Sequence, residues 1–177
     1  MKSLLFLAAA LSGLSQPKTF DQTVQFMGGT LGRTVTVCID GSEVKTTMAG
    51  RLSFRDQRRS WSSYCADVRS PIAGGQFMHV RIGSAKLAGP NIRKAGHIVA
   101  KYLKLAKTAD ECAAIQLAVW EAVEDGGETA DFGSGRFMAQ ASEKVISLAQ
   151  QAYQAGQDAG EGTYMQSQDG GQSQMTT

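Results

Sequence analysis

The chain has 177 residues, of which 42% are hydrophobic and 19% charged, with a formal net charge of +2. This length can bury the core of one modest domain, and the apolar residues fall into periodic segments, which excludes disorder over most of the chain. The 18 basic residues are mixed with 16 acidic ones, so the composition argues against a nucleic-acid binder. Three cysteines leave one over after any pairing.

The first 15 residues have the pattern of a secretory signal peptide. A short basic start, Met1–Ser3, precedes the apolar run Leu4–Leu14, which ends in small residues. The run is shorter than the roughly 20 residues that a membrane anchor needs, and no later segment is apolar enough to cross a bilayer. We therefore expect a protein that is secreted or otherwise extracytoplasmic, a class that includes proteins associated with a cell surface. A buried N-terminal helix of the mature fold is the alternative.

Residues 19–90 carry the alternating pattern that is typical of strands. The runs are rich in Val, Thr and aromatic residues: 34–39, 46–54, 61–68 and 77–82. Asp40-Gly41 separates two of them and predicts a tight turn. Gly28-Gly29 and Gly74-Gly75 are interpreted as loops, because no P-loop lysine or following helix accompanies them. This half is predicted to form an antiparallel barrel or sandwich.

Residues 91–155 change to the period of a helix. Three helices are predicted: one ending near Lys107, one from Thr108 to about Glu124, and one after the loop 131–135, with Met138 on its apolar side and Gly156 as its terminator. Thr108 and Glu111 form the pattern of a capping box. Strands followed by helices make an α+β fold over residues 19–155. The Gly-, Gln- and Ser-rich residues 156–177 are predicted to be a disordered tail.

One polar residue interrupts the apolar stripe of the second helix. Cys112, Ile115, Val119, Trp120 and Val123 follow the spacing of a buried face, and Gln116 lies at its centre. An amide buried there without a partner costs roughly 1 to 3 kcal/mol. One interpretation is a Gln hydrogen-bonded to nearby backbone, which is the general rule for buried polar groups. The other is that its side-chain carbonyl carbon is bonded to a cysteine sulfur.

Two motifs resemble those of bacterial surface thioester domains. The stretch Ala113–Glu121 (AAIQLAVWE) resembles that family's apolar-Gln-x-x-apolar-Trp helix, and Ser63–Val68 (SYCADV) resembles its aromatic-Cys motif. The segments Met48–Phe54 and Asp131–Phe137 also resemble the strand before the cysteine and the loop after the Trp helix. The resemblance covers about residues 23–153, and the Gln-Trp helix is its most specific part.

This resemblance implies a strand-rich subdomain that carries Cys65 and a helical subdomain that carries Gln116, joined by a thioester. The thiolate attacks the carboxamide carbon and expels ammonia, which requires close approach but no cofactor. Tyr64 and Trp120 are expected to exclude water. The expected partner is an amine, most simply a lysine of a surface protein, that takes the acyl group in one single-use coupling rather than in enzymatic turnover. Attachment or adhesion is the implied function.

The other two cysteines leave two alternatives open. We prefer Cys65 over Cys38 for the thioester, because Cys65 has the aromatic neighbour and follows the expected strand. Cys38 and Cys112 then either form a disulfide, as suits an exported protein, or remain buried thiols.

Other constellations are weaker. Cys65 with His79 or His97 would be a cysteine hydrolase, but neither histidine lies in a recognisable catalytic motif. Two histidines and three cysteines without short paired spacing do not predict a metal site. The competing functional class is a non-reactive extracellular binding or structural module of the same fold, in which Gln116 is only a buried hydrogen-bonding residue.

Overall fold

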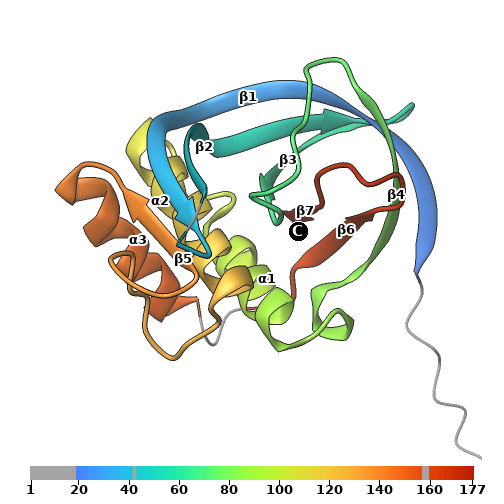
Figure 1. Cartoon of the computed structure of the whole chain (residues 1–177). Helices are drawn as coiled ribbons and strands as arrows, with labels where there is room; N and C mark the ends of the chain where they lie inside the picture. The colour runs from blue at the N-terminus through green and yellow to red at the C-terminus, as the bar shows by residue number, and fades with distance from the viewer. Residues whose placement is uncertain (1–18, 42, 157–159) are drawn as a thin grey trace, which may run out of the picture.

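The computed structural model describes residues 19–41, 43–156 and 160–177 (Figure 1). Its strands are β1 (Phe20–Ile39), β2 (Glu43–Arg55), β3 (Ser60–Cys65), β4 (Phe77–Ser84), β5 (Phe137–Gln140), β6 (Thr163–Ser167) and β7 (Gln174–Thr176). Its α-helices are α1 (Pro90–Tyr102), α2 (Ala109–Glu124) and α3 (Glu143–Ala155), and a short 3-10 helix, η1 (Ala85–Leu87), precedes α1. The α+β class is confirmed. The predicted signal peptide, residues 1–15, lies outside the described residues.

One antiparallel sheet contains all seven strands, in the order β2-β3-β7-β6-β4-β1-β5. β1 also pairs with β2 over most of its length, so the pairings return to their starting strand and β5 extends the sheet from β1. The long curved β1 makes this possible, because its first residues pair with β4 and its last with β5 (Figure 1). The helices gather at one end of the sheet, where α2 packs against β1 and β2.

The turn between β1 and β2 is the one that the sequence predicts. Asp40 and Gly41 both have positive φ, 53° and 68°, a conformation that Gly and Asp adopt at low cost. Gly74-Gly75 also lies in a turn, as predicted. Gly28-Gly29 does not: both residues lie inside β1, at register shifts against β2. These bulges bend the long strand and account for its curvature.

The three predicted helices are present, with two changes of boundary. α1 ends at Tyr102, five residues before the predicted end, and α3 begins only at Glu143. Met138 was expected on the third helix but lies in β5, where it pairs with Cys38 of β1. Gly156 ends α3 as predicted, and the capping box of Thr108 and Glu111 at the start of α2 is confirmed.

The prediction of a disordered tail over residues 156–177 is wrong for its last part. β6 pairs with β4, and β7 pairs with both β6 and β3, which inserts the C-terminal end into the middle of the sheet. The polar side chains there are satisfied by the sheet: Gln174 is fully buried and accepts a hydrogen bond from Ser63, and Thr176 donates to the Ser62 carbonyl. Met165 and Met175 supply the buried apolar contacts that the composition concealed.

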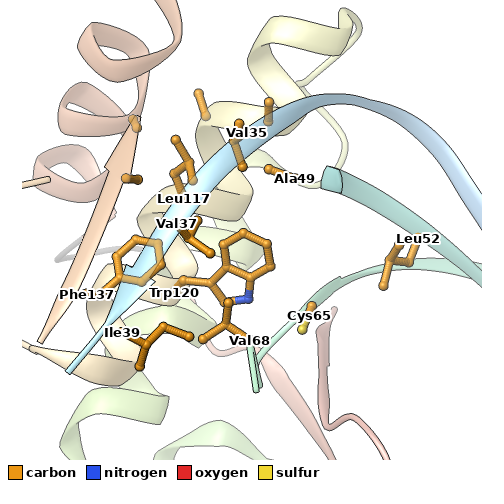
Figure 2. Close-up of a cluster of buried hydrophobic side chains, with 14 of the residues drawn as sticks. Val35, Val37, Ile39, Ala49, Leu52, Cys65, Val68, Leu117, Trp120 and Phe137 are labelled. Atoms are coloured by element: carbon orange, nitrogen blue, oxygen red, sulfur yellow. The ribbon is translucent and has the colours of Figure 1, made fainter. Parts of the chain in front are cut away.

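Helix α2 lies between two apolar clusters and is buried from Cys112 through Ala122. Leu117 and Trp120 pack into the cluster beneath β1 and β2, together with Val35, Val37 and Phe137 (Figure 2). The opposite side of α2, with Ile115 and Val119, packs into a second cluster against α1. A helix buried all round needs apolar residues on every face, and α2 is accordingly more apolar than its neighbours.

Candidate functional site

Cys65 is the last residue of β3 and is 2% exposed. Its position is set on one side by the pairing of β3 with β2 and on the other by its own pairing with Gln174 of β7. The thiol donates a hydrogen bond to the Asp67 carbonyl at 2.9 Å and accepts one from the Asp67 N–H at 3.3 Å. The chain thus turns tightly around the sulfur immediately after the strand ends.

Gln116 lies midway along α2 and is 1% exposed. Its carboxamide makes two hydrogen bonds, both with the backbone of one residue. The Cys65 N–H donates to Oε1 at 2.9 Å, and Nε2 donates to the Cys65 carbonyl at 2.8 Å. The buried amide is therefore satisfied, and the structure brings together the two residues that the motifs single out, although 51 positions separate them.

The environment of the Cys65 sulfur combines burial with two N–H donors. Burial raises the pKa of the Cys65 thiol to about 12, while the Trp120 indole and the Asp67 N–H oppose that rise by favouring the thiolate. Among the described residues the Trp120 indole N–H has no hydrogen-bond acceptor, so it is available to an anion at the sulfur. Figure 2 shows the indole nitrogen on the edge of the ring that faces Cys65.

A groove of about 410 Å³ leads from the surface to this pair. Cys65, Gln116 and Trp120 lie along its floor, and its walls come from β2 and from the loop that follows β3: Lys45, Thr46, Thr47, Met48, Arg69, Ser70, Pro71 and Ile72. Lys45 is the cross-strand partner of the buried Val37, so its side chain lies on the core side of β2. Its ammonium donates to the Val68 carbonyl, next to the Asp67 carbonyl that binds the sulfur.

The two aromatic residues that were expected to exclude water lie on different sides of β3. Trp120 is buried and lines the groove, as the prediction requires. Tyr64 points into the second cluster, because adjacent strand residues face opposite ways. The expected role for Tyr64 beside the sulfur therefore has to be corrected: its ring supports the far face of β3, and burial there raises its pKa far above the ordinary value.

The structure does not bring Cys38 and Cys112 together, and all three cysteines are free thiols. Cys38 alternates with the buried Val37 and Ile39, so its side chain lies on the outer face of β1. Cys112 is fully buried in the second cluster, on a helix that packs against the inner face of β1. A Cys38–Cys112 disulfide would have to cross the strand, and the alternative of two buried thiols describes Cys112 but not Cys38, which is partly exposed.

Neither histidine shares the groove with Cys65. His79 is on β4, where its ring is hydrogen-bonded to Thr23, and His97 is on α1. The lining of the groove includes neither, so the geometry gives no support to a cysteine hydrolase. Within the described ranges, no group of three or more His, Cys, Asp or Glu residues is arranged to hold a metal ion. None of the helices described is long and apolar enough to cross a membrane.

The sequence did not single out two contributors to the site. Lys45 was not distinguished from the other cations, although its place opposite the apolar Val37 marks it as facing inward. The composition of the C-terminal segment predicts a tail, yet Gln174 pairs with Cys65, and Gln172 lines the groove and donates to the Ser70 carbonyl. The alternation around Met165 and the isolated Met175 were the only signals of strands there.

Comparison of this chain with models of known protein families, with curated proteins and with solved structures finds no match in any of the three.

Proposed function

We propose that Cys65 and Gln116 form an internal thioester that couples the protein covalently to an amine of another molecule. One observation carries this proposal: both hydrogen bonds of the buried Gln116 carboxamide are with the backbone of Cys65. Any nearby backbone would satisfy a buried amide. Bonding to the backbone of the residue that bears the thiol brings the Gln116 carboxamide to Cys65 itself, which favours the close approach of sulfur and carbon that proximity catalysis needs.

The first step is an exchange of one acyl bond. The Cys65 sulfur attacks Cδ of Gln116, the carbon–nitrogen bond breaks, and the thiol proton leaves with the amide nitrogen as ammonia. Negative charge develops on Oε1 as the sulfur adds, and the Cys65 N–H already donates to that oxygen at 2.9 Å. The Trp120 indole and the Asp67 N–H favour the thiolate. The chain itself therefore supplies the donors that the step requires.

The second step uses the groove. A primary amine attacks the same carbon, the carbon–sulfur bond breaks, and the amine proton passes to the sulfur, which regenerates the Cys65 thiol. The product is an isopeptide bond if the amine is a lysine. Since Gln116 is consumed, each molecule reacts once, and the protein acts as an attachment device rather than as an enzyme. Because residues 1–15 have the pattern of a signal peptide, we propose that the protein acts outside the cytoplasm, either secreted or at a cell surface.

A non-reactive extracellular module of the same fold is the second candidate. The observation that favours it is that the Gln116 amide is fully satisfied by hydrogen bonds as it stands. In that case the Cys65 thiol and the Gln116 amide both persist, and the groove binds its partner without a covalent step.

Incubation with methylamine separates the two candidates. The reactive protein gains one methylamine in place of one ammonia, peptide mapping locates it on Gln116, and Cys65 becomes available to alkylation. Cys65→Ala abolishes the adduct. Cys112→Ala, which removes a buried thiol one helical turn before Gln116 on α2, leaves the adduct in place. Absence of the adduct from the unmodified protein would leave only the non-reactive candidate, and persistence of the adduct in Cys65→Ala would show that the reaction does not pass through Cys65.

A further inference from the structure

The second edge of β2 is open beside the site. β2 pairs with β1 from Glu43 to Arg55, but it pairs with β3 only from Leu52 to Arg55. β3 then leaves this edge and continues against β7. Within the described part of the chain, no strand and no loop backbone pairs with the edge between Val44 and Arg51. Open edges of this kind present unpaired N–H and C=O groups to any extended chain.

This edge is also a wall of the reactive groove. Four consecutive residues of β2, Lys45 to Met48, line it. Side chains alternate between the two faces of a sheet, so a groove that lay on one face would be lined by only every second residue of the strand. Because four consecutive residues of β2 line this groove, the edge of the strand itself borders it. The loop residues Arg69 to Ile72 line the same space, which forms a slot beside an exposed strand edge, where Met48 is 56% exposed.

The slot carries one uncompensated positive charge. Its lining includes Lys45 and Arg69 but no Asp or Glu. Arg69 is neutralised by Glu124 at 2.8 Å and Asp40 at 3.0 Å. Lys45 donates to the Val68 carbonyl, and the ion pairs of the described residues do not include it. A carboxylate arriving in the slot would therefore find a partner in Lys45.

We propose that the acyl acceptor is an extended polypeptide that docks as an added strand along the Val44–Met48 edge of β2, with a lysine directed at Gln116 and an acidic side chain directed at Lys45. Residues two apart in a strand share a face, so the expected acceptor motif is Glu-x-Lys or Lys-x-Glu. The lysine nitrogen bonds to the Gln116 carbon, the bond to sulfur breaks, and the proton passes to Cys65. This inference rests on the proposed thioester and names the class of its partner.

Competition between synthetic acceptors tests the docking. A short Glu-x-Lys peptide is compared with two other acceptors: the same peptide N-methylated at its backbone, and a single lysine that is capped at its α-amino and α-carboxyl groups. All three acceptors carry the same nucleophile, a lysine side-chain amine. We expect the parent peptide to couple to Gln116 about tenfold faster than the other two, since N-methylation removes the donors that pair with the strand edge. Equal coupling rates for the three acceptors would overturn the proposal.

The charge contact has its own matched pair of variants. Replacing Glu by Gln in the peptide is expected to slow its coupling to the unmodified protein several-fold. The same slowing is expected with the control variant Lys86→Met, because Lys86 is exposed and lies outside the groove. With Lys45→Met the two peptides should couple alike. A Glu preference that survives Lys45→Met would show that the carboxylate is bound elsewhere and would overturn the assignment to Lys45.

Reversible binding distinguishes failure of the docking from failure of the thioester. In Cys65→Ala no thioester can form, and the parent peptide should slow amide hydrogen exchange at Val44–Met48, whereas the N-methylated peptide should not. If methylamine couples to the unmodified protein but exchange and peptide rates show no preference, the docking proposal falls and the thioester remains. If no amine couples at all, the thioester falls, and protection at β2 alone decides whether the edge binds an extended chain.

Discussion

At the scale of single residues, the site depends on a thiol held in an environment that suits a neutral group. Cys65 is buried, and its sulfur is bonded to the Asp67 backbone. Burial protects a thioester from water, but it also disfavours the thiolate that must form it. The N–H donors of Asp67 and Trp120 offset part of this cost, so formation of the proposed bond is expected to be driven by proximity rather than by an activated sulfur.

The pKa of Cys65 can be tested where no thioester can form. In Gln116→Ala, alkylation of Cys65 by iodoacetamide should rise with pH through pH 9 and beyond without levelling off, because burial raises the thiol pKa to about 12. In the same chain unfolded in denaturant, the alkylation rate should reach half its maximum near pH 9, the ordinary pKa of a thiol. A midpoint in the folded protein at or below that of the unfolded chain would mean that the site stabilises the thiolate outright.

Glu121 is a second buried ionisable group, on the side of α2 away from the groove. It is 2% exposed, one carboxylate oxygen accepts from the Asp131 N–H, and the other has no partner among the described residues. Burial raises its pKa from 4.5 to about 7. The folded protein therefore binds this proton more tightly than the unfolded chain, so the group's contribution to stability is complete below pH 4.5 and is lost as pH rises through 7.

Glu121→Gln should remove that pH dependence, because an amide keeps the acceptor for Asp131 without a charge. The unfolding free energy of the unmodified protein relative to the variant should fall between pH 5 and pH 8, by at most about 3 kcal/mol. Urea denaturation at both pH values measures it, with the exposed Glu161→Gln as the control. A constant difference between Glu121→Gln and the unmodified protein would show that Glu121 is already ionised in the fold at pH 5.

At the scale of elements, the site is made by the meeting of β3 and α2. Their local structure could be predicted: the alternation around Cys65, the capping box at Thr108 and the apolar stripe around Gln116 all identify the right elements. Their contact could not be derived from periodicity, because hydrogen bonds across 51 positions depend on how the sheet closes. The resemblance to thioester domains supplied that pairing as an expectation, and the structure places the two residues side by side.

The misassigned elements share a physical cause. β5, β6 and β7 are short strands, and a short strand is stabilised by its neighbours more than by its own residues. Gln174 looks like a tail residue until Ser63 and Gln172 become its hydrogen-bond partners. Adjacency to Cys65 predicts that Tyr64 lies at the site, but side chains alternate along a strand, and Tyr64 lies on the opposite face of β3.

The importance of β7 can be measured through one side chain. Met175 is fully buried and pairs with Tyr64, so Met175→Ala should lower the unfolding free energy by about 2 to 5 kcal/mol. Since β7 also pairs with Cys65, the proposed thioester should be hydrolysed faster in this variant. An increase of free Cys65 thiol over time measures that hydrolysis. Met27→Ala, at a position 46% exposed, should change neither property. Equal behaviour of the two variants would contradict a structural role for the C-terminal strand at the site.

At the scale of the whole molecule, the strand pairings of the sheet close on themselves, and the buried helix α2 packs against the sheet (Figure 1), with Cys65 and Gln116 in contact at their common boundary. The sheet ends β3 at Cys65, α2 brings Gln116 to it, and the slot beside β2 gives access from one side. Burial of this boundary would protect the proposed thioester from water until a partner amine reaches it.

The intact mass of the purified full chain tests the thioester most directly. The predicted result is a mass lower than that of the sequence, after any processing of the N-terminus, by one ammonia, with Cys65→Ala and Gln116→Ala both at full mass and Cys38→Ala and Cys112→Ala retaining the loss. A full mass for the unmodified protein, or an ammonia loss that persists in Cys65→Ala, would contradict the Cys65–Gln116 bond.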